Sequence, residues 1–204
     1  MTARHEAPSR NIFISAIDEV TEMMADTGCV PPLSDVARCI GVPQAQLQIY
    51  FPDETALVEA MSQNALLLLH HTLIEAAGKA DPDDPAEQFM ALADAYIEWG
   101  FRYPREFRVI GLMPTSIFEA NPMLMRYERS IHELMAKIME RALGDEAAEC
   151  DLSSFLSIAH SYAFGVVSKM LAGDLARWNP GLSNREAARQ NMRIFIRQFL
   201  PACH

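Results

Sequence analysis

The chain has 204 residues, 50% of them hydrophobic and 22% charged, which suits one large domain, or a small domain joined to a larger one, with a sizeable core. Its net charge of −10 argues against broad electrostatic attraction to DNA, RNA or an anionic membrane. The longest unbroken apolar run, Ala65 to Leu69, is far shorter than the roughly 20 residues that span a bilayer, so we expect no membrane partner.

The cysteines and the first residues indicate the compartment. Four cysteines lie far apart in the sequence and form no Cys-x-x-Cys pair. Arg4, His5 and Glu6 are followed by no apolar segment of the kind that a secretory signal needs. We therefore expect a reduced, cytoplasmic protein, with a frayed tail over Met1 to Ser9.

Apolar residues recur with helical spacing along almost the whole chain, and no stretch alternates with the period of two that marks a strand. The pattern predicts an all-α protein of about nine helices. Capping residues mark several of the helix starts, among them Asp53, Asn121 and the Ser183-x-x-Glu186 capping box. The expected helices run from Asn11 to Thr27, Ser34 to Ile40, Gln44 to Tyr50, Asp53 to Gly78, the acidic turn at 81–85 to Arg102, Pro104 onward, Asn121 to Gly144, Leu152 to Leu171, and Ser183 onward.

Two of the short helices near the front have the spacing of a helix-turn-helix. Such a motif needs a small residue where its helices cross, a turn residue that tolerates left-handed geometry, and an apolar anchor on the second helix. Ala37, Gly41 and Leu47 supply these at separations of four and six. An ordinary helical hairpin with a glycine turn has the same pattern, so the spacing alone leaves both interpretations open.

The surrounding residues favour the DNA-binding interpretation. From about Ile12 to Met61 the chain resembles the N-terminal domain of TetR-type (tetracycline-repressor-like) transcriptional regulators. The resemblance rests on an apolar first helix ending at Gly28, on "LSDVARCIGV" and on "LQIYFPDETALVEAM". Its most specific part is Tyr50-Phe51-Pro52 followed by Ala56-Leu57. The resemblance implies that the helix from Gln44 to Tyr50 enters the major groove and that the helix starting at Asp53 begins near a phosphate.

The residues that this resemblance places at DNA depart from the family pattern. The family commonly has Ser-Lys at Pro43-Gln44, Gly-Thr or Ala-Thr at Ala45-Gln46, Tyr and His at Gln48-Ile49, and Lys at Glu54. Glutamine can pair bidentately with adenine, and backbone amides can bind phosphate, so DNA contact does not require Lys or Arg. The expected DNA-binding residues are Arg38, Gln44, Ala45, Gln46, Gln48, Tyr50 and Asp53.

The charge of the front end leaves two interpretations open. Residues 1–60 carry three basic and nine acidic side chains, a net charge of −6. No Lys or Arg occurs between Arg38 and Lys79. The front end is therefore either an operator-binding domain with a shallow salt dependence, or a domain that has kept its fold and lost tight DNA binding.

The central third of the chain is rich in aromatic residues and methionine, which line many small-molecule sites. The segment from Tyr96 to Leu112 is similar to part of the ligand-binding domain of many TetR-type proteins. The same residues can also be plain core. The expected effector-binding residues are Trp99, Tyr103, Phe107, Met113, Phe118, Tyr127 and Tyr162.

The last two long helices predict a homodimer. A stripe of small residues follows one side of the helix from Leu152 to Leu171, and small side chains let a second helix approach closely. A stripe that merely faces water has the same composition. The expected interface residues are Ser157, Ser161, Gly165, Ser168, Met192, Phe195 and Phe199.

No catalytic or metal-binding constellation is present in the sequence. It has no phosphate-binding glycine loop and no G-x-S-x-G elbow. His70 and His71 are adjacent on a helix and project about 100° apart, so they cannot chelate a metal from one face. We expect no enzyme activity, no cofactor and no metal.

Together these patterns predict a helix-turn-helix DNA-binding domain over residues 1–56 and a helical ligand-binding and dimerisation domain over residues 57–204. The expected function is a TetR-like regulator that binds a palindromic operator as a dimer and is released by a small, largely apolar effector. The alternative is a small-molecule-binding or interaction protein of the same fold that has lost tight operator binding.

Overall fold

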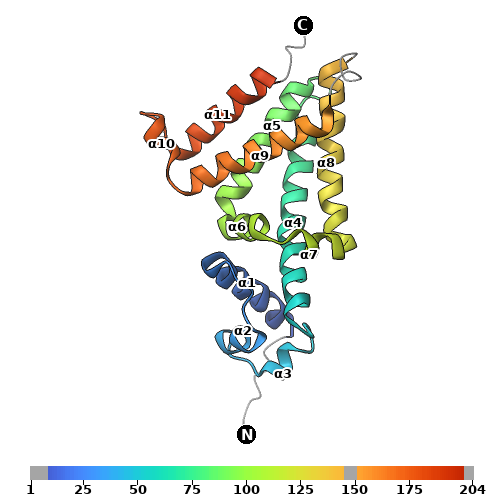
Figure 1. Ribbon diagram of the computed structural model, residues 1–204, viewed down its shortest axis with the longest axis vertical. Coiled ribbons are helices and arrows are strands. Elements are labelled where there is room, and N and C mark those ends of the chain that lie inside the picture. Colours follow the sequence, from blue (N-terminus) through green and yellow to red (C-terminus); the bar gives the residue numbers. More distant parts are fainter. Residues whose placement is uncertain (1–8, 145–150, 200–204) are drawn as a thin grey trace. The chain divides into compact units, whose positions relative to one another are not determined.

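The computed structural model describes residues 9–144 and 151–199, and the expected tail over Met1 to Ser9 lies almost wholly outside them. The described residues form eleven helices and no strands, which confirms the all-α prediction (Figure 1). Two short helices, Thr115–Ala120 and Leu175–Trp178, raise the count above the expected nine. At six and four residues, both are too short for an apolar period to reveal them.

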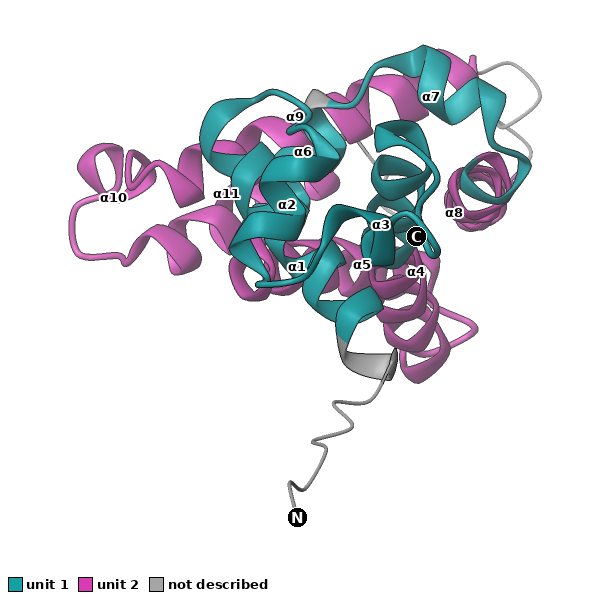
Figure 2. Cartoon of the chain, turned by 90° about the horizontal axis from the view of Figure 1, so that it is seen from below, with its two compact units in different colours: residues 1–66, 105–124 teal, residues 67–104, 125–204 magenta. Residues whose placement is uncertain are grey.

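The chain divides into two compact units (Figure 2). Unit 1 comprises residues 1–66 and 105–124, and unit 2 comprises residues 67–104 and 125–204. Unit 1 holds α1 (Ser9–Thr27), α2 (Leu33–Cys39), α3 (Gln44–Leu47), the first part of α4 (Glu54–Lys79), all of α6 (Pro104–Leu112) but its first residue, and α7 (Thr115–Ala120). Unit 2 holds the rest of α4, α5 (Pro85–Arg102), nearly all of α8 (Pro122–Leu143), α9 (Leu152–Leu171), α10 (Leu175–Trp178) and α11 (Asn184–Phe199).

The predicted helix caps are confirmed by hydrogen bonds. The Asp53 carboxylate accepts from the Ala56 amide at 2.8 Å, and the Asn121 side chain accepts from the Met123 amide at 2.9 Å. In the capping box, the Ser183 amide donates to the Glu186 carboxylate at 2.8 Å, and the Ser183 hydroxyl accepts from the Glu186 amide at 3.3 Å. These bonds satisfy amide groups that the first turn of a helix leaves without a helical partner.

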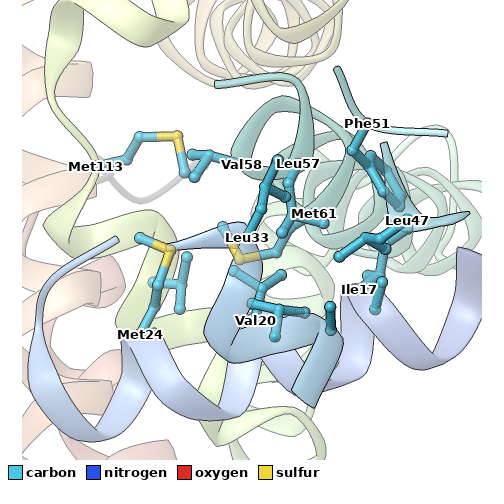
Figure 3. Packing of buried hydrophobic residues seen from close by; sticks show 14 residues of the cluster. Ile17, Val20, Met24, Leu33, Leu47, Phe51, Leu57, Val58, Met61 and Met113 are labelled. Atoms are coloured by element: carbon cyan, nitrogen blue, oxygen red, sulfur yellow. The ribbon is translucent and has the colours of Figure 1, made fainter. Parts of the chain in front are cut away.

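The core of unit 1 joins its first helices to the start of α4. The apolar faces of α1 and α2 meet Leu47, Phe51 and the first two turns of α4 (Figure 3). Phe13 of α1 also stacks on Phe51, with ring centroids 5.0 Å apart. Val109 and Met113 extend this core to α6, and the Ser62 hydroxyl donates to the Met113 sulfur at 3.1 Å. The core therefore includes residues that lie far beyond residue 56 in the sequence.

Unit 2 is built around α5, α9 and α11, which pack against one another. A charged cluster joins α5 to α11 along this packing: the Glu98 carboxylate accepts from Arg185 and from Arg189, the latter at 2.6 Å. Asp94, one turn earlier, faces Arg189 and Arg193 at 3.8 Å. The cluster fixes the register between the two helices.

We expect Glu98→Gln to lower the free energy of unfolding by about 1–2 kcal/mol. Glu98 is about one-third exposed, so its pairing is worth more than that of a surface ion pair and less than that of a buried one. Urea denaturation followed by circular dichroism measures the change. Glu87→Gln, at an exposed position of the same helix, is the control and should shift the midpoint little. If the two substitutions lower the free energy of unfolding equally, the ion pairs of Glu98 with α11 do not stabilise the fold.

Candidate nucleic-acid interface

The α2–turn–α3 segment has the backbone geometry of a helix-turn-helix. After α2, Gly41 adopts φ +73°, in the left-handed region that only glycine enters without strain. The Gly41 amide donates to the Arg38 carbonyl at 3.2 Å, and the Val42 amide donates to the Ala37 carbonyl at 3.0 Å. Ala37 itself is 1% exposed. The predicted crossing residue and turn residue are thus confirmed in their structural roles.

We expect Gly41→Ala to destabilise the protein by about 1–2 kcal/mol, because any residue with a β-carbon is strained at this φ. A β-carbon would meet nothing within 4 Å, so the cost comes from the backbone alone. Gly78→Ala is the matched control: its β-carbon also meets nothing within 4 Å, its φ is helical, and alanine favours a helix. Thermal denaturation should show a loss for Gly41→Ala and none for Gly78→Ala. A loss of similar size in both would contradict the account.

Leu47 and Phe51 anchor the second helix in unit 1. Leu47 is fully buried and Phe51 is 1% exposed. Both belong to the cluster that contains Leu57, Val58 and Met61 of α4 (Figure 3). Helix α3 ends at Leu47, earlier than the predicted Tyr50, and the amides of Tyr50 and Phe51 both donate to the Leu47 carbonyl at 3.0 Å. The buried side of this segment is therefore committed to the core.

A hydrogen bond that sequence reasoning missed ties α4 to the start of α2. The Glu54 carboxylate accepts from the Leu33 amide at 3.0 Å, and this bond lowers the pKa of Glu54 below its ordinary value. Pro32 stands at the cap position of α2 and offers no side-chain hydrogen bond of its own. The acidic residue at a position where the TetR pattern commonly has Lys thus caps a neighbouring helix. Its partner is 21 residues away, so no local pattern indicates it.

The outer side of the motif carries the predicted DNA-contacting residues. Gln44, Ala45, Gln46 and Gln48 are all exposed, and Tyr50 is half-buried against the core of unit 1. Ile49, which the prediction left out of this set, is 76% exposed. The structure brings these side chains onto one short segment of about two turns. None of the four exposed polar or small residues has a part in the core.

The charges beside this segment are mostly neutralised or negative. Arg38 is 75% exposed, and its guanidinium donates to the Asp35 carboxylate at 2.8 Å. The Asp53 carboxylate holds the Ala56 amide, so that amide already has an anionic partner at the start of α4. Any DNA contact here therefore depends on side-chain hydrogen bonds and apolar contact more than on net charge.

The predicted effector-binding residues are divided between the two units. Unit 1 holds Phe107 and Met113, both buried, and Phe118, which packs against its core; the other four belong to unit 2. In unit 2, Trp99 is 2% exposed, and Tyr162 stacks on Phe195 with ring centroids 4.2 Å apart. A groove of about 580 Å³ in unit 2 is lined by other residues, among them Ile74, Leu134 and Arg141.

The predicted dimer residues fall into two groups. Ser157, Ser161 and Gly165 are exposed along α9, and Ser168 is half-buried. On α11, Met192 and Phe195 are buried inside unit 2, at 2% and 8% exposure, while Ile194 is 53% exposed. The Phe199 side chain lies outside the described residues. The open side of α11 is thus marked by Ile194 rather than by the larger side chains on which the prediction rested.

Other kinds of site find no support in residues 9–144 and 151–199. No group of three or more His, Cys, Asp or Glu side chains there is placed to hold a metal ion. Within the same ranges, no helix is both long and apolar enough to cross a membrane. Cys29 and Cys39 are exposed free thiols.

Solved structures share this fold over nearly their whole length. The ketosteroid transcriptional regulator KstR2 of Mycobacterium tuberculosis matches with a TM-score of 0.70 at 14% identity, over 96% of this chain and 97% of that one. The fatty acid degradation regulator FadR from Bacillus halodurans matches with a TM-score of 0.68 at 11% identity, over 99% of each chain. The TetR family transcriptional regulator PfmR from Thermus thermophilus matches with a TM-score of 0.61 at 16% identity, over 93% of this chain and 98% of that one.

No protein-family model and no curated protein sequence matches the chain. The structural matches have low identity, and they establish the architecture. They agree with the resemblance that the residues from Ile12 to Met61 carry. The chain therefore has the fold of the TetR-family transcriptional regulators.

Proposed function

We propose that this protein is a transcriptional regulator that binds a palindromic operator through its helix-turn-helix, as a homodimer, and is released by a small, largely apolar effector. The observation that carries the proposal is the α2–turn–α3 segment. Its buried side is anchored by Leu47 and its turn by Gly41, while Gln44, Ala45, Gln46 and Gln48 face solvent. A recognition helix needs this division between an anchoring side and a reading side.

In this proposal the exposed residues divide the work of DNA contact. Gln44 and Gln48 lie one turn apart and pair with adenine edges, and Gln46 and Tyr50 reach the backbone. Arg38 supplies the ionic contact of the motif once it exchanges Asp35 for a phosphate. Asp53 acts indirectly, by holding the first turn of α4.

A second candidate function is a small-molecule-binding or interaction protein that keeps the fold without tight operator binding. The paired Arg38 and the carboxylates of Asp53 and Glu54 favour it, because a polyanion is repelled by acidic side chains. Gel shifts on fragments of the protein's own upstream region, at low salt, separate the two candidates. A discrete shifted band supports the regulator. The absence of any band at low salt would leave only the second candidate.

We propose that the dimer forms through α9 and α11, with Ser157, Ser161 and Gly165 at the centre and Ser168 beside them. Met192 and Phe195 hold α11 from inside unit 2. The exposed small residues leave room for a second helix, and Ile194 offers an apolar contact beside them. In the proposed dimer, two recognition helices would contact successive major grooves, about 34 Å apart.

Gly165→Glu is expected to convert the dimer into a monomer, because it places a charged side chain where the partner helix must approach. Light scattering at micromolar concentration measures the mass. His132→Glu, which adds the same charge at an exposed position of α8, outside α9 and α11, is expected to leave the dimer intact. A Gly165→Glu protein that stays dimeric would contradict this interface.

We propose that the effector is bound by the part of the chain after residue 56. In unit 2 the candidate residues are Trp99, Tyr103, Tyr127 and Tyr162. These side chains are largely apolar, and the names of KstR2 and FadR refer to ketosteroids and to fatty acid degradation. The effector would favour a conformer whose recognition helices no longer match the operator, with α4 as the lever between residues 1–56 and 57–204.

A tryptophan signal tests effector binding. The chain has two tryptophans, and Trp178 is 71% exposed whereas Trp99 is 2% exposed. In a Trp178→Phe variant, all of the tryptophan fluorescence comes from Trp99. Titration with long-chain fatty acids and sterols should shift the emission of Trp99 and raise the melting temperature. If neither quantity changes with any apolar compound that releases the operator, Trp99 is not part of the effector site.

A further inference from the structure

Ile49 is a large apolar side chain that the fold does not use. At 76% exposure it is more open to solvent than any other large hydrophobic residue that the structure describes. Its neighbours along the chain, Leu47 and Phe51, are buried, so the segment does bury apolar groups where the core can take them. An exposed isoleucine among the side chains that a helix-turn-helix presents to DNA is free to contact a base edge.

Ile49 lies in the turn that follows α3, between the buried residues Leu47 and Phe51. Gln48 keeps helical angles, φ −63° and ψ −17°, and the Tyr50 amide donates to the Leu47 carbonyl at 3.0 Å. At about 100° per residue, Ala45 and Ile49 each project roughly 160° away from Leu47, on either side of the outermost line. The side of α3 and of the following turn that faces away from Leu47 is therefore apolar.

Glutamines flank this apolar point. By the same helical period, Gln44 and Gln48 lie on one side of it and Gln46 on the other. All three are exposed. The reading side therefore presents a hydrophobic tip formed by Ala45 and Ile49, bordered by side chains that both donate and accept hydrogen bonds.

In the DNA major groove, the 5-methyl group of thymine is the apolar feature of the base edges, and adenine is the base that pairs bidentately with glutamine. Both belong to A·T pairs. We propose that the hydrophobic tip of Ala45 and Ile49 contacts thymine methyl groups in an A·T-rich half-site, while Gln44 or Gln48 pairs with adenine. This inference rests on the proposed operator function and names the bases that the operator must contain.

Apolar contact also suits the charge of the motif. With a net charge of −6 over residues 1–60, counterion release adds little affinity. Removing apolar surface from water does not depend on ion pairing, and one methyl group buried against a side chain is worth about fourfold in affinity. Two half-sites in a palindrome double the number of such contacts. The hydrophobic tip therefore contributes DNA affinity that Lys and Arg contribute in more basic DNA-binding motifs.

The test replaces thymine in the DNA with uracil, which differs from thymine only by lacking the 5-methyl group. The probe is the tightest-binding fragment, about 30 base pairs long, of the protein's own upstream region, made with thymine or with deoxyuridine in the half-sites. The full-length wild-type protein is expected to bind the uracil probe at least about fourfold more weakly. Ile49→Ser is expected to bind the thymine probe more weakly and to show little difference between the two probes.

Gln48→Ala is the matched control: it should weaken binding to both probes and preserve their ratio. Unchanged melting temperatures show that the exposed substitutions leave the fold intact. Equal wild-type affinity for the two probes overturns this inference alone, and failure to bind any upstream fragment overturns the proposed function together with it. If Ile49→Ser instead changes the mass in solution and keeps the probe ratio, Ile49 contacts a second copy and the inference falls.

Discussion

Leu47→Ala is expected to lower the free energy of unfolding by about 2–5 kcal/mol, the range measured when a buried leucine is truncated to alanine. Leu47 is fully buried and packs in the cluster that holds α1, α2 and the start of α4 together (Figure 3). Truncation removes its transfer free energy and leaves a cavity that the short α3 cannot close. Urea denaturation followed by circular dichroism measures the loss, and operator binding should fall with it.

The control for Leu47→Ala lies two residues away. Ile49→Ala removes a side chain of the same size from a position that is 76% exposed, and its effect on stability should stay within about 0.5 kcal/mol. Because both substitutions remove the same apolar volume, a difference between their effects on stability comes from the burial of Leu47. Similar destabilisation by both substitutions would mean that Leu47 does not anchor the motif.

Gln44→Lys is expected to steepen the salt dependence of DNA binding and to strengthen binding to a scrambled fragment, which does not depend on the adenine contact. It restores the basic residue that TetR-type proteins commonly carry at this position, on an exposed site at the start of α3. One new phosphate contact per protomer adds two in a dimer, so the slope of log K against log salt should become more negative by about 1.8. Fluorescence anisotropy with an upstream fragment, between about 50 and 200 mM salt, measures it.

Two further variants separate local charge from net charge. Gln44→Glu should weaken binding at low salt, and His132→Lys, at an exposed position of α8 in unit 2, should leave the slope nearly unchanged. If His132→Lys steepens the salt dependence as much as Gln44→Lys does, the effect comes from the charge of the whole protein, and α3 is not the DNA-facing element.

Much of the fold could be predicted from local signals in the sequence. The helix caps at Asp53, Asn121 and Ser183 act over three or four residues, so a local pattern is enough to identify them. The left-handed turn at Gly41 is likewise a single-residue requirement. Each long helix was found in the place that its apolar period predicted.

Features that depend on distant partners could not be predicted. The Glu54–Leu33 bond spans 21 residues. Comparison with the family pattern therefore showed that a Lys is missing at position 54, but it could not show that Glu54 caps α2. On α11, periodicity identified Met192 and Phe195 as one apolar face but could not tell the chain's own core from a partner's surface. Ile49 was visible as a departure from the pattern, and only its exposure makes it a candidate for contact.

In the proposed function, the reading helix of this TetR-fold protein relies on glutamine and apolar contact rather than on charge. Low charge explains the shallow salt dependence that we expect, and it limits binding to unrelated DNA. Specific and non-specific affinities should therefore respond differently to salt.

The most direct test is the salt dependence of binding to the protein's own upstream fragment, beside a scrambled fragment of equal length. A dimer has six Lys and Arg side chains over residues 1–60, so the slope of log K against log salt should be no steeper than about −5. We predict a dimer that binds the upstream fragment at least about a thousandfold more tightly than the scrambled one. Equal affinity for both fragments, or no complex at about 50 mM salt, would contradict the account.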